Sequence, residues 1–347
     1  MKTACLIGPK TIEFRDLPKP EAPVDGLVLK MEACGICGSD LRRWQEGPPA
    51  GAPYLIQGHE IAGVVVECGP SVRRFKTGDR VAIAPDIHCG DCWYCSRGLF
   101  NLCVNLRLLG ITPGYDGGFS EYISLSNEIL KNGIVHRMPE GLSFQEGGLA
   151  ETLSSVLAAQ RHCQLDLGET VVVMGAGPIG CLHTALAHAR GARVILAEPN
   201  PMRREMAAKF DPEVMIDVTA KDVVSEVKRL TNNLGADVVI CANPVASTQT
   251  QAVEMARRGG RIVLFGGLPK ANPMASLNAN LIHYGEQVVM GAFSYHPSFH
   301  EEALQFLLNK TIQSEDFITH VLPLSNLPEA FQIAASGAAL KVMVTAS

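Results

Sequence analysis

Apolar residues in the first 150 positions occur in short runs that glycine and proline separate. Runs such as Leu27–Met31, Ile61–Glu67 and Arg80–Ala84 are bounded by turn-forming pairs and triplets, for example Gly69-Pro70 and Thr77-Gly78-Asp79. Short strands at regular spacing are typical of an all-β domain. We therefore expect residues 1–150 to form a β domain.

The pattern changes near Leu149, where strand-like apolar runs begin to alternate with amphipathic helical stretches. This alternation predicts a parallel sheet with helices on both faces, which we place at residues 151–285. We expect residues 286–347, with a helix at Phe299–Lys310 and a strand at Lys341–Thr345, to return to the first domain. The strands predicted in the second domain are Val171–Met174, Val194–Ala197, Val214–Asp217, Val238–Cys241 and Arg261–Phe265, and the helices are Gly177–Arg190, Met202–Phe210, Asp222–Leu234 and Thr248–Arg257.

Composition excludes several classes of protein. The 347 residues are enough for two domains. A content of 47% hydrophobic and 19% charged residues excludes a disordered chain. The net charge is −5 and no Lys/Arg run occurs, so we expect no nucleic-acid partner. Apolar stretches such as Val171–Leu182 are too short and too broken by glycine to span a membrane. Because Met1–Phe14 shows no signal-peptide pattern, we expect a cytoplasmic protein.

The cysteines indicate a metal site. Their number, eleven, is odd, which argues against a disulfide framework. Four of them, in the pattern Cys89-x₂-Cys92-x₂-Cys95-x₇-Cys103, could wrap a tetrahedral ion, and four thiolates leave no open position. We therefore predict a structural zinc site. An iron–sulfur cluster or free thiols are the alternatives, and the neighbouring motifs favour zinc.

A second set of residues has the composition of a catalytic zinc site. Cys37 lies in a glycine-rich turn, and His59 and Glu60 follow Gly58 at the start of a predicted strand. One thiolate, one imidazole and a carboxylate, with one position left for water or substrate, is how a catalytic zinc is bound. Together with Glu151, these residues are the predicted ligands.

The segment Gly175-Ala176-Gly177-Pro178-Ile179-Gly180 follows a predicted strand and opens a predicted helix. In this setting glycines permit a tight turn and close approach of a pyrophosphate to the helix N-terminus. Glu198, at the end of the next strand, would accept hydrogen bonds from the ribose hydroxyls, so we expect NAD rather than NADP. Arg203 and Arg204 lie just beyond and could hold a 2′-phosphate, although a solvated helical turn is the simpler interpretation.

These motifs occur in a fixed order, and in that order the chain resembles the zinc-containing medium-chain dehydrogenase/reductases over essentially its whole length. It looks most similar to the polyol (sorbitol/iditol) and sugar-alcohol-phosphate dehydrogenases, because Glu151 stands where simple two-zinc alcohol dehydrogenases carry a cysteine ligand. The polyol enzymes usually have proline after that glutamate, whereas this chain has Thr152. The motifs are Cys37-Gly38-Ser39-Asp40, Gly58-His59-Glu60-x-x-Gly63, Gly78-Asp79-Arg80-Val81, the four-cysteine segment, Gly117-Gly118-Phe119-Ser120-Glu121-Tyr122 and the Gly175–Gly180 segment.

The resemblance implies an α/β fold, with a GroES-like β catalytic domain made from both ends of the chain and a Rossmann doubly wound parallel-sheet domain inserted between them. It implies one catalytic and one structural zinc per chain, and oxidation of a secondary hydroxyl of a polyol to a ketone with NAD. Ser39 would take the first proton, Asp40 would orient His59, and Glu151 would bind the zinc or the zinc-bound water. A homotetramer or homodimer is implied as well. A threonine or simple secondary-alcohol dehydrogenase and a non-catalytic NAD-binding protein are the alternatives.

A second position departs from the family. Related enzymes commonly have a histidine five residues after the zinc cysteine, as the outer member of a proton relay. Here Arg42 occupies that position and Arg43 follows. Arginine cannot shuttle a proton at ordinary pH. Either arginine could bind a phosphate of the cofactor or of a phosphorylated polyol, or both could lie on a solvated helix face.

Overall fold

The structure is a computed structural model that describes residues 1–346. The chain divides into two compact units, which are described separately. Unit 1 contains residues 1–154 and the chain from Ser294 onward, and unit 2 contains Ser155–Phe293. The chain passes from unit 1 into unit 2 within one helix, α3 (Phe144–His162).

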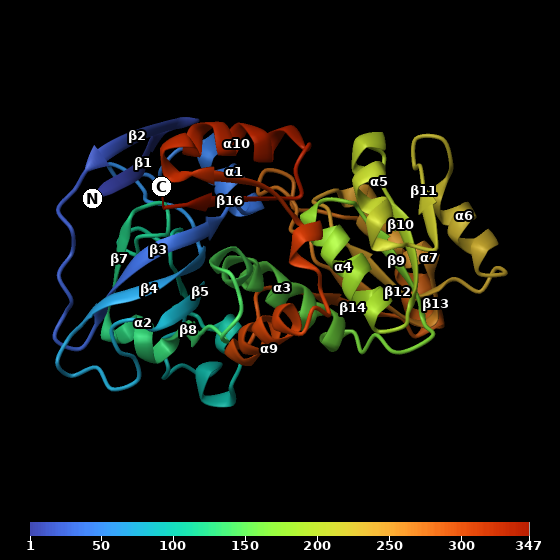
Figure 1. Ribbon diagram of the computed structural model, residues 1–347. Helices are drawn as coiled ribbons and strands as arrows, with labels where there is room; N and C mark the ends of the chain where they lie inside the picture. The colour runs from blue at the N-terminus through green and yellow to red at the C-terminus, as the bar shows by residue number, and fades with distance from the viewer. Residues whose placement is uncertain (347) are drawn as a thin grey trace. The chain divides into compact units, whose positions relative to one another are not determined.

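Unit 1 is built on an eight-stranded sheet (Figure 1). Its strand order is β15-β16-β3-β4-β5-β6, with β7 paired to β3 and β8 paired to β5, and a separate hairpin joins β1 and β2. The C-terminal strand β16 pairs antiparallel with β3, so both ends of the chain enter one sheet. The strands are β1 (Lys2–Gly8), β2 (Thr11–Asp16), β3 (Leu27–Gly35), β4 (Glu60–Cys68), β5 (Arg80–Ile87), β6 (Arg107–Leu108), β7 (Tyr122–Leu125), β8 (Gly133–Arg137), β15 (Ile318–Pro323) and β16 (Lys341–Thr345).

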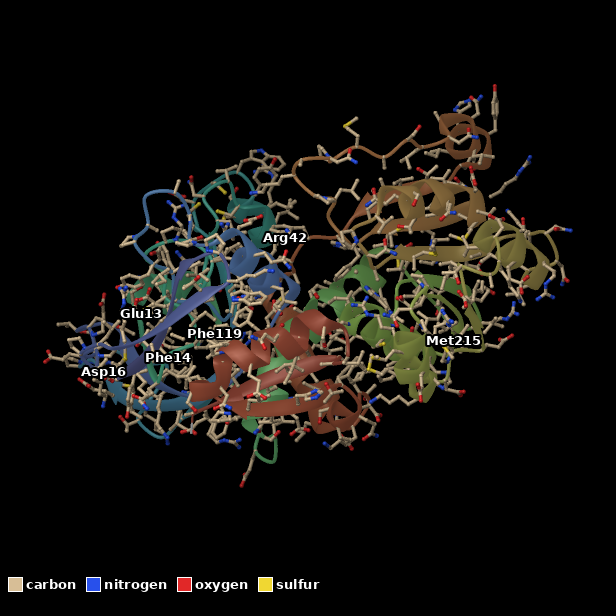
Figure 2. All side chains as sticks on the ribbon, turned by 90° about the horizontal axis from the view of Figure 1, so that it is seen from above. Glu13, Phe14, Asp16, Arg42, Phe119 and Met215 are labelled. Carbon is tan, nitrogen blue, oxygen red and sulfur yellow. The ribbon has the colours of Figure 1, made fainter. Side chains whose placement is uncertain are left out.

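Helices from distant parts of the sequence close the core of unit 1. Phe331 of α10 contacts Trp44 of α1 and lies edge-on to Phe119, with ring centroids 5.4 and 5.7 Å apart. Phe119, labelled in Figure 2, is 1% exposed. The C-terminal segment therefore completes this core, because without it these aromatic rings would lose their partner. Besides α3, the helices of unit 1 are α1 (Gly38–Glu46), α2 (Asn127–Asn132), α9 (Pro297–Leu308) and α10 (Leu327–Ser336), with 3₁₀ turns η1 (Cys95–Arg97), η2 (Phe100–Leu102), η4 (Ser314–Asp316) and η5 (Leu324–Asn326).

Unit 2 is a parallel sheet of six strands in the order β11-β10-β9-β12-β13-β14. The chain winds outward from β9 in one direction and then from β12 in the other, so the winding direction changes between β9 and β12. In open α/β sheets, ligands bind at the carboxyl ends of the strands at this point. The elements are β9 (Thr170–Met174), α4 (Pro178–Ala189), β10 (Arg193–Ala197), α5 (Pro201–Ala207), η3 (Ala208–Phe210), β11 (Val214–Ile216), α6 (Val223–Leu230), β12 (Ala236–Cys241), α7 (Ala246–Met255), β13 (Ala256–Leu264), α8 (Ala279–Gly285) and β14 (Val288–Gly291).

The observed α/β fold confirms the predicted fold class, but several predicted helix ends were wrong, by up to four residues. The helix predicted to reach Leu234 ends at Leu230, because Asn232 and Asn233 adopt left-handed conformations with φ of 51° and 63°. The helix predicted to reach Arg257 ends at Met255, where β13 begins. Asparagine tolerates the left-handed region and therefore ends a helix without the glycine that the sequence pattern would signal.

Candidate active site

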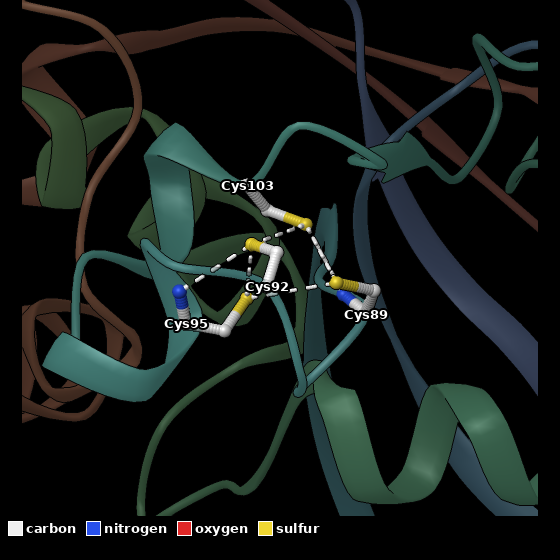
Figure 3. Close-up of side chains that lie close together, drawn as sticks. All are labelled: Cys89, Cys92, Cys95 and Cys103. Atoms are coloured by element: carbon white, nitrogen blue, oxygen red, sulfur yellow. Dashed lines mark hydrogen bonds between the residues drawn. The ribbon is translucent and has the colours of Figure 1, made fainter.

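Cys89, Cys92, Cys95 and Cys103 form a compact cluster in unit 1 (Figure 3). All four sulfur atoms lie within 4.8 Å of one another, and four of their separations are 3.4, 3.5, 3.9 and 4.0 Å. Zn–S bonds of about 2.3 Å in a tetrahedron place the sulfurs about 3.8 Å apart. The geometry therefore fits one tetrahedral ion, whereas an iron–sulfur cluster, with its own atoms between the thiolates, would hold them farther apart.

Cys37 lies at the N-terminus of α1 and is fixed there by Asp40. The Asp40 carboxylate accepts a hydrogen bond from the Cys37 backbone N–H at 3.0 Å and another from the Gly58 N–H at 3.3 Å. Since one carboxylate holds both the cysteine turn and the residue before His59, Asp40 brings the two predicted ligand segments together.

His59 lies between Asp40 and Ser39. Its Nδ1 is 3.4 Å from an Asp40 carboxylate oxygen, and its Nε2 is 3.2 Å from the Ser39 hydroxyl. Burial lowers the pKa of His59, but the charge and hydrogen bonding of Asp40 outweigh it and raise that pKa well above the usual value. The position of Asp40 therefore suits a residue that orients the His59 ring.

Glu60, at the start of β4, is fully buried and is paired with Lys341 of β16. The Lys341 ammonium lies 2.6 and 2.8 Å from the two carboxylate oxygens, and the Thr152 hydroxyl donates to one of them at 2.8 Å. Gly35 makes room for this pair, because a Cβ at that position would lie 1.8 Å from a Glu60 oxygen. Thr152, the departure noted in the sequence, therefore contributes a hydrogen bond that proline could not.

Glu151 lies on α3 and is half-buried. The Tyr295 hydroxyl donates to its carboxylate at 3.2 Å. Desolvation and, next, repulsion from Glu60 raise the pKa of Glu151 to about 7. A cation nearby would relieve this repulsion, so the surroundings of Glu151 fit a metal ion.

The two predicted metal sites are organised differently. Within residues 1–346, only the four cysteines gather three or more ligand atoms within 4.8 Å of one another. Cys37, His59, Glu60 and Glu151 lie in one region, as the mutual influence of their charges shows, but Glu60 is turned towards Lys341. The donor set of one thiol, one imidazole and two carboxylates nonetheless suits zinc.

In unit 2, the loop after β9 has the geometry that a dinucleotide needs. Gly175 has φ of +109°, and a Cβ on Gly180 would lie 1.8 Å from the Gly175 carbonyl oxygen. A Cβ on Gly177 would meet nothing within 4 Å, so the backbone there is open to a ligand. Pro178 and Ile179 begin α4 and leave the helix N-terminus facing the loop.

Glu198 is held against this loop. Its carboxylate accepts hydrogen bonds from the Ala176 N–H at 2.7 Å and the Asn200 N–H at 2.9 Å, and the residue is 4% exposed. Arg204 is occupied by Asp217 at 2.8 Å. Arg203 lies in the first turn of α5, where the Asn200 side chain caps its backbone. Arg204 is therefore engaged in an ion pair, which leaves Arg203 as the other arginine considered for a 2′-phosphate.

The two arginines of α1 differ in exposure. Arg42, labelled in Figure 2, is exposed, and Arg43 forms an ion pair with Glu46 at 3.2 Å. For Arg43, this contact agrees with the solvated helix face that the sequence left as one alternative.

Sequence reasoning missed three residues in or beside the candidate site: Lys341, Tyr295 and Asp86. Lys341 stands alone as a charge in the apolar run Leu340–Val344, which is the one available signal that it is a buried partner. Asp86 is a buried carboxylate at the end of β5 that accepts a hydrogen bond from Ser294. Nothing in the sequence around Tyr295 indicates that it faces Glu151.

Comparison with known proteins identifies the family. Residues 24–139 match the family model of the alcohol dehydrogenase GroES-like domain, and residues 178–309 match that of the zinc-binding dehydrogenases. The sorbitol dehydrogenase of Bacillus subtilis is 33% identical, over 99% of this chain and 97% of the relative. That of Rattus norvegicus is 31% identical, over 97% and 93%. A solved zinc-binding dehydrogenase from Sinorhizobium meliloti, bound to NADP, is 33% identical with a TM-score of 0.90 and covers 99% of this chain and 98% of its own.

The fold and the matches over both parts of the chain define a zinc-dependent oxidoreductase. The chain belongs to the zinc-containing medium-chain dehydrogenase/reductase family.

Proposed function

We propose that this protein oxidises a secondary hydroxyl of a polyol to a ketone and transfers the hydride to NAD. The observation that carries the proposal is Glu151, a carboxylate beside Glu60 and His59 at the position where simple alcohol dehydrogenases carry a cysteine. The similarity to sorbitol dehydrogenases supports it. We also propose that unit 1 is the catalytic domain and unit 2 the nucleotide domain. The boundary expected at residue 286 then moves to Ser294, because β14 (Val288–Gly291) pairs with β13 in the sheet of unit 2.

Cys37, His59, Glu60 and Glu151 would hold a catalytic zinc, and Cys89, Cys92, Cys95 and Cys103 a structural zinc. A bound catalytic zinc supplies Lewis-acid chemistry that lowers the pKa of a substrate hydroxyl. Ser39, 3.2 Å from the His59 ring, takes the proton of that hydroxyl. Asp40 holds both the Cys37 turn and His59 in position. The proton leaves through water, because Arg42 cannot accept it.

The loop Gly175–Gly180 would bind the cofactor pyrophosphate at the N-terminus of α4. Glu198 already accepts two backbone hydrogen bonds and retains acceptor capacity for ribose hydroxyls. Its negative charge would repel a 2′-phosphate, which favours NAD. Arg203 is the residue that would favour NADP instead, and the NADP-bound relative makes this alternative worth testing.

We further propose a cytoplasmic homotetramer or homodimer. Among the described residues, no helix is long and apolar enough to span a membrane. In unit 2, β14 is an edge strand, and Tyr284, Val288 and Phe293 near it are 73%, 48% and 59% exposed. An uncovered edge strand with apolar neighbours favours association with a second copy.

The test is reduction of NAD⁺ and NADP⁺ by the purified, zinc-loaded protein with sorbitol, xylitol, their phosphates, threonine and 2-propanol. We expect turnover of a polyol with NAD⁺ and its loss in Glu151→Ala, whereas the exposed Glu140→Ala serves as the control. Turnover of phosphorylated polyols alone would place Arg42 at the substrate. Turnover of threonine or 2-propanol alone, or of nothing, would refute the proposal.

A further inference from the structure

Asp86 lies where β5 departs from regular pairing. The register between β5 and β8 shifts between Ala84 and Ile87, which leaves Pro85 and Asp86 in a bulge-like irregularity. Asp86 pairs instead with Leu108 of β6 and is 7% exposed. Bulges re-aim a side chain and are frequent next to active sites.

Only one hydrogen-bond donor reaches this carboxylate. Within residues 1–346, it is the Ser294 hydroxyl, and Asp86 forms no ion pair with a lysine or arginine. Ser294 has φ of +49°, an uncommon conformation for a residue other than glycine. Residues in such conformations persist where the surroundings over-determine them, often at functional sites.

Tyr295, the residue after Ser294, connects Asp86 to the candidate active site. Tyr295 donates to Glu151, so two adjacent residues, Ser294 and Tyr295, bind two different carboxylates. The charge of Asp86 also acts on Glu151, and the charge of His59 acts on Asp86. Asp86 therefore borders the region where a substrate hydroxyl would meet His59 and Glu151.

The chemistry of Asp86 is incomplete as it stands. A carboxylate has about four acceptor positions, and Ser294 fills one. Burying a carboxylate with so few donors is unfavourable unless water or a ligand supplies more. Burial raises the pKa of Asp86 to about 6, so it is mostly ionised at neutral pH and remains a hydrogen-bond acceptor.

We propose that Asp86 is a specificity-determining residue that accepts a hydrogen bond from a second hydroxyl of the polyol, next to the carbon that is oxidised. This inference rests on the proposed function. It predicts that the enzyme selects substrates with two neighbouring hydroxyls over alcohols with one. It also predicts a hydroxyl and not a phosphate on the carbon beside the oxidised one, because Asp86 would repel an anion.

The experiment compares wild type with Asp86→Asn in the zinc-loaded protein, using sorbitol, xylitol and 2-propanol. A hydrogen bond to a charged acceptor contributes enough to raise KM for the polyol about tenfold to a hundredfold. We expect KM for 2-propanol, the cofactor Kd and the zinc content to stay unchanged, as in the control Glu140→Gln. Calorimetric binding of sorbitol should weaken by the same factor, and this measurement does not require turnover of 2-propanol.

Ser294→Ala separates binding from a structural role. If Asp86 only anchors the segment at Ser294, both variants should lower the melting temperature alike and impair all substrates equally, and the inference is then wrong. An unchanged KM and Kd for the polyol in Asp86→Asn would also overturn it. If the wild type neither binds nor oxidises a polyol, the proposed function itself has failed, which is a separate outcome.

Discussion

The two proposed metal sites of unit 1 differ in how the chain builds them. The four-cysteine cluster comes from one segment of fifteen residues, Cys89–Cys103, whose turns bring all four sulfurs within 4.8 Å. The catalytic set comes from β4, from the start of α1 and from α3, and one of its carboxylates is bound by Lys341. A site whose ligands fill every coordination position can thus be formed by one local segment. A site that leaves one position free depends on partners distant in the sequence, which hold its charged ligands in place.

The largest effect on stability should come from the four-cysteine cluster. Replacing Cys92 by Ser removes one of four thiolates, and structural zinc contributes directly to folding. We expect a loss of on the order of 5 kcal/mol, or failure of unit 1 to fold, measured by thermal unfolding. Cys68→Ser, outside the cluster, is the matched control. If Cys92→Ser unfolds like wild type, the cluster is not structural.

A substitution in the predicted catalytic set should instead reduce activity and leave stability almost unchanged. Cys37→Ser should lower kcat/KM about a thousandfold or more, because a ligand that positions the Lewis acid is lost. Its melting temperature should remain close to that of wild type, and the structural zinc should stay bound. Steady-state kinetics and metal analysis of the same sample check both statements. A large loss of stability without loss of activity would reverse the roles of the two sites.

The pair Glu60–Lys341 sharpens the comparison. Lys341→Met leaves the Glu60 carboxylate buried without its cation, which should destabilise the protein by about 3 kcal/mol or more. Adding Glu60→Gln to this variant should recover most of that stability, because no uncompensated charge remains. A double-mutant cycle by chemical denaturation measures the coupling. Additive effects would mean that the pair contributes no specific interaction.

Two carboxylates on α3 have opposite surroundings. Burial raises the pKa of Glu146, but hydrogen bonds from Lys310, Ser143 and Ser314 outweigh it and lower that pKa to about 2, whereas the pKa of Glu151 is raised to about 7. Because the pKa of Glu146 is lower in the folded state, its contribution is complete above about pH 4.5 and is lost as the pH falls towards 2.

Glu146→Gln should therefore destabilise the protein by about 2 kcal/mol at neutral pH. The difference from wild type should shrink steadily below about pH 4.5. Denaturant unfolding of both proteins, from neutral pH to below about pH 4.5, measures this difference in stability. A difference that does not change with pH would contradict the ion-pair account of Glu146.

The sequence predicted what depends on local spacing. The four-cysteine pattern, the Gly175–Gly180 loop and the alternation of strands and helices in unit 2 are all readable over short stretches. Partners of the catalytic set could not be predicted in this way, since Lys341 lies 281 residues from Glu60 and Tyr295 lies 144 residues from Glu151. Only the folded sheet brings such pairs together.

The measurement that tests the central claim most directly is zinc content and activity followed together while a chelator removes metal from the wild type. The account predicts two zinc ions per chain at the start. It predicts that activity disappears as the first ion leaves, while the remaining ion keeps the melting temperature near its initial value until it too is removed. Retained activity with one zinc, or unfolding that accompanies loss of the first ion, would contradict the division into an open catalytic site and a closed structural one.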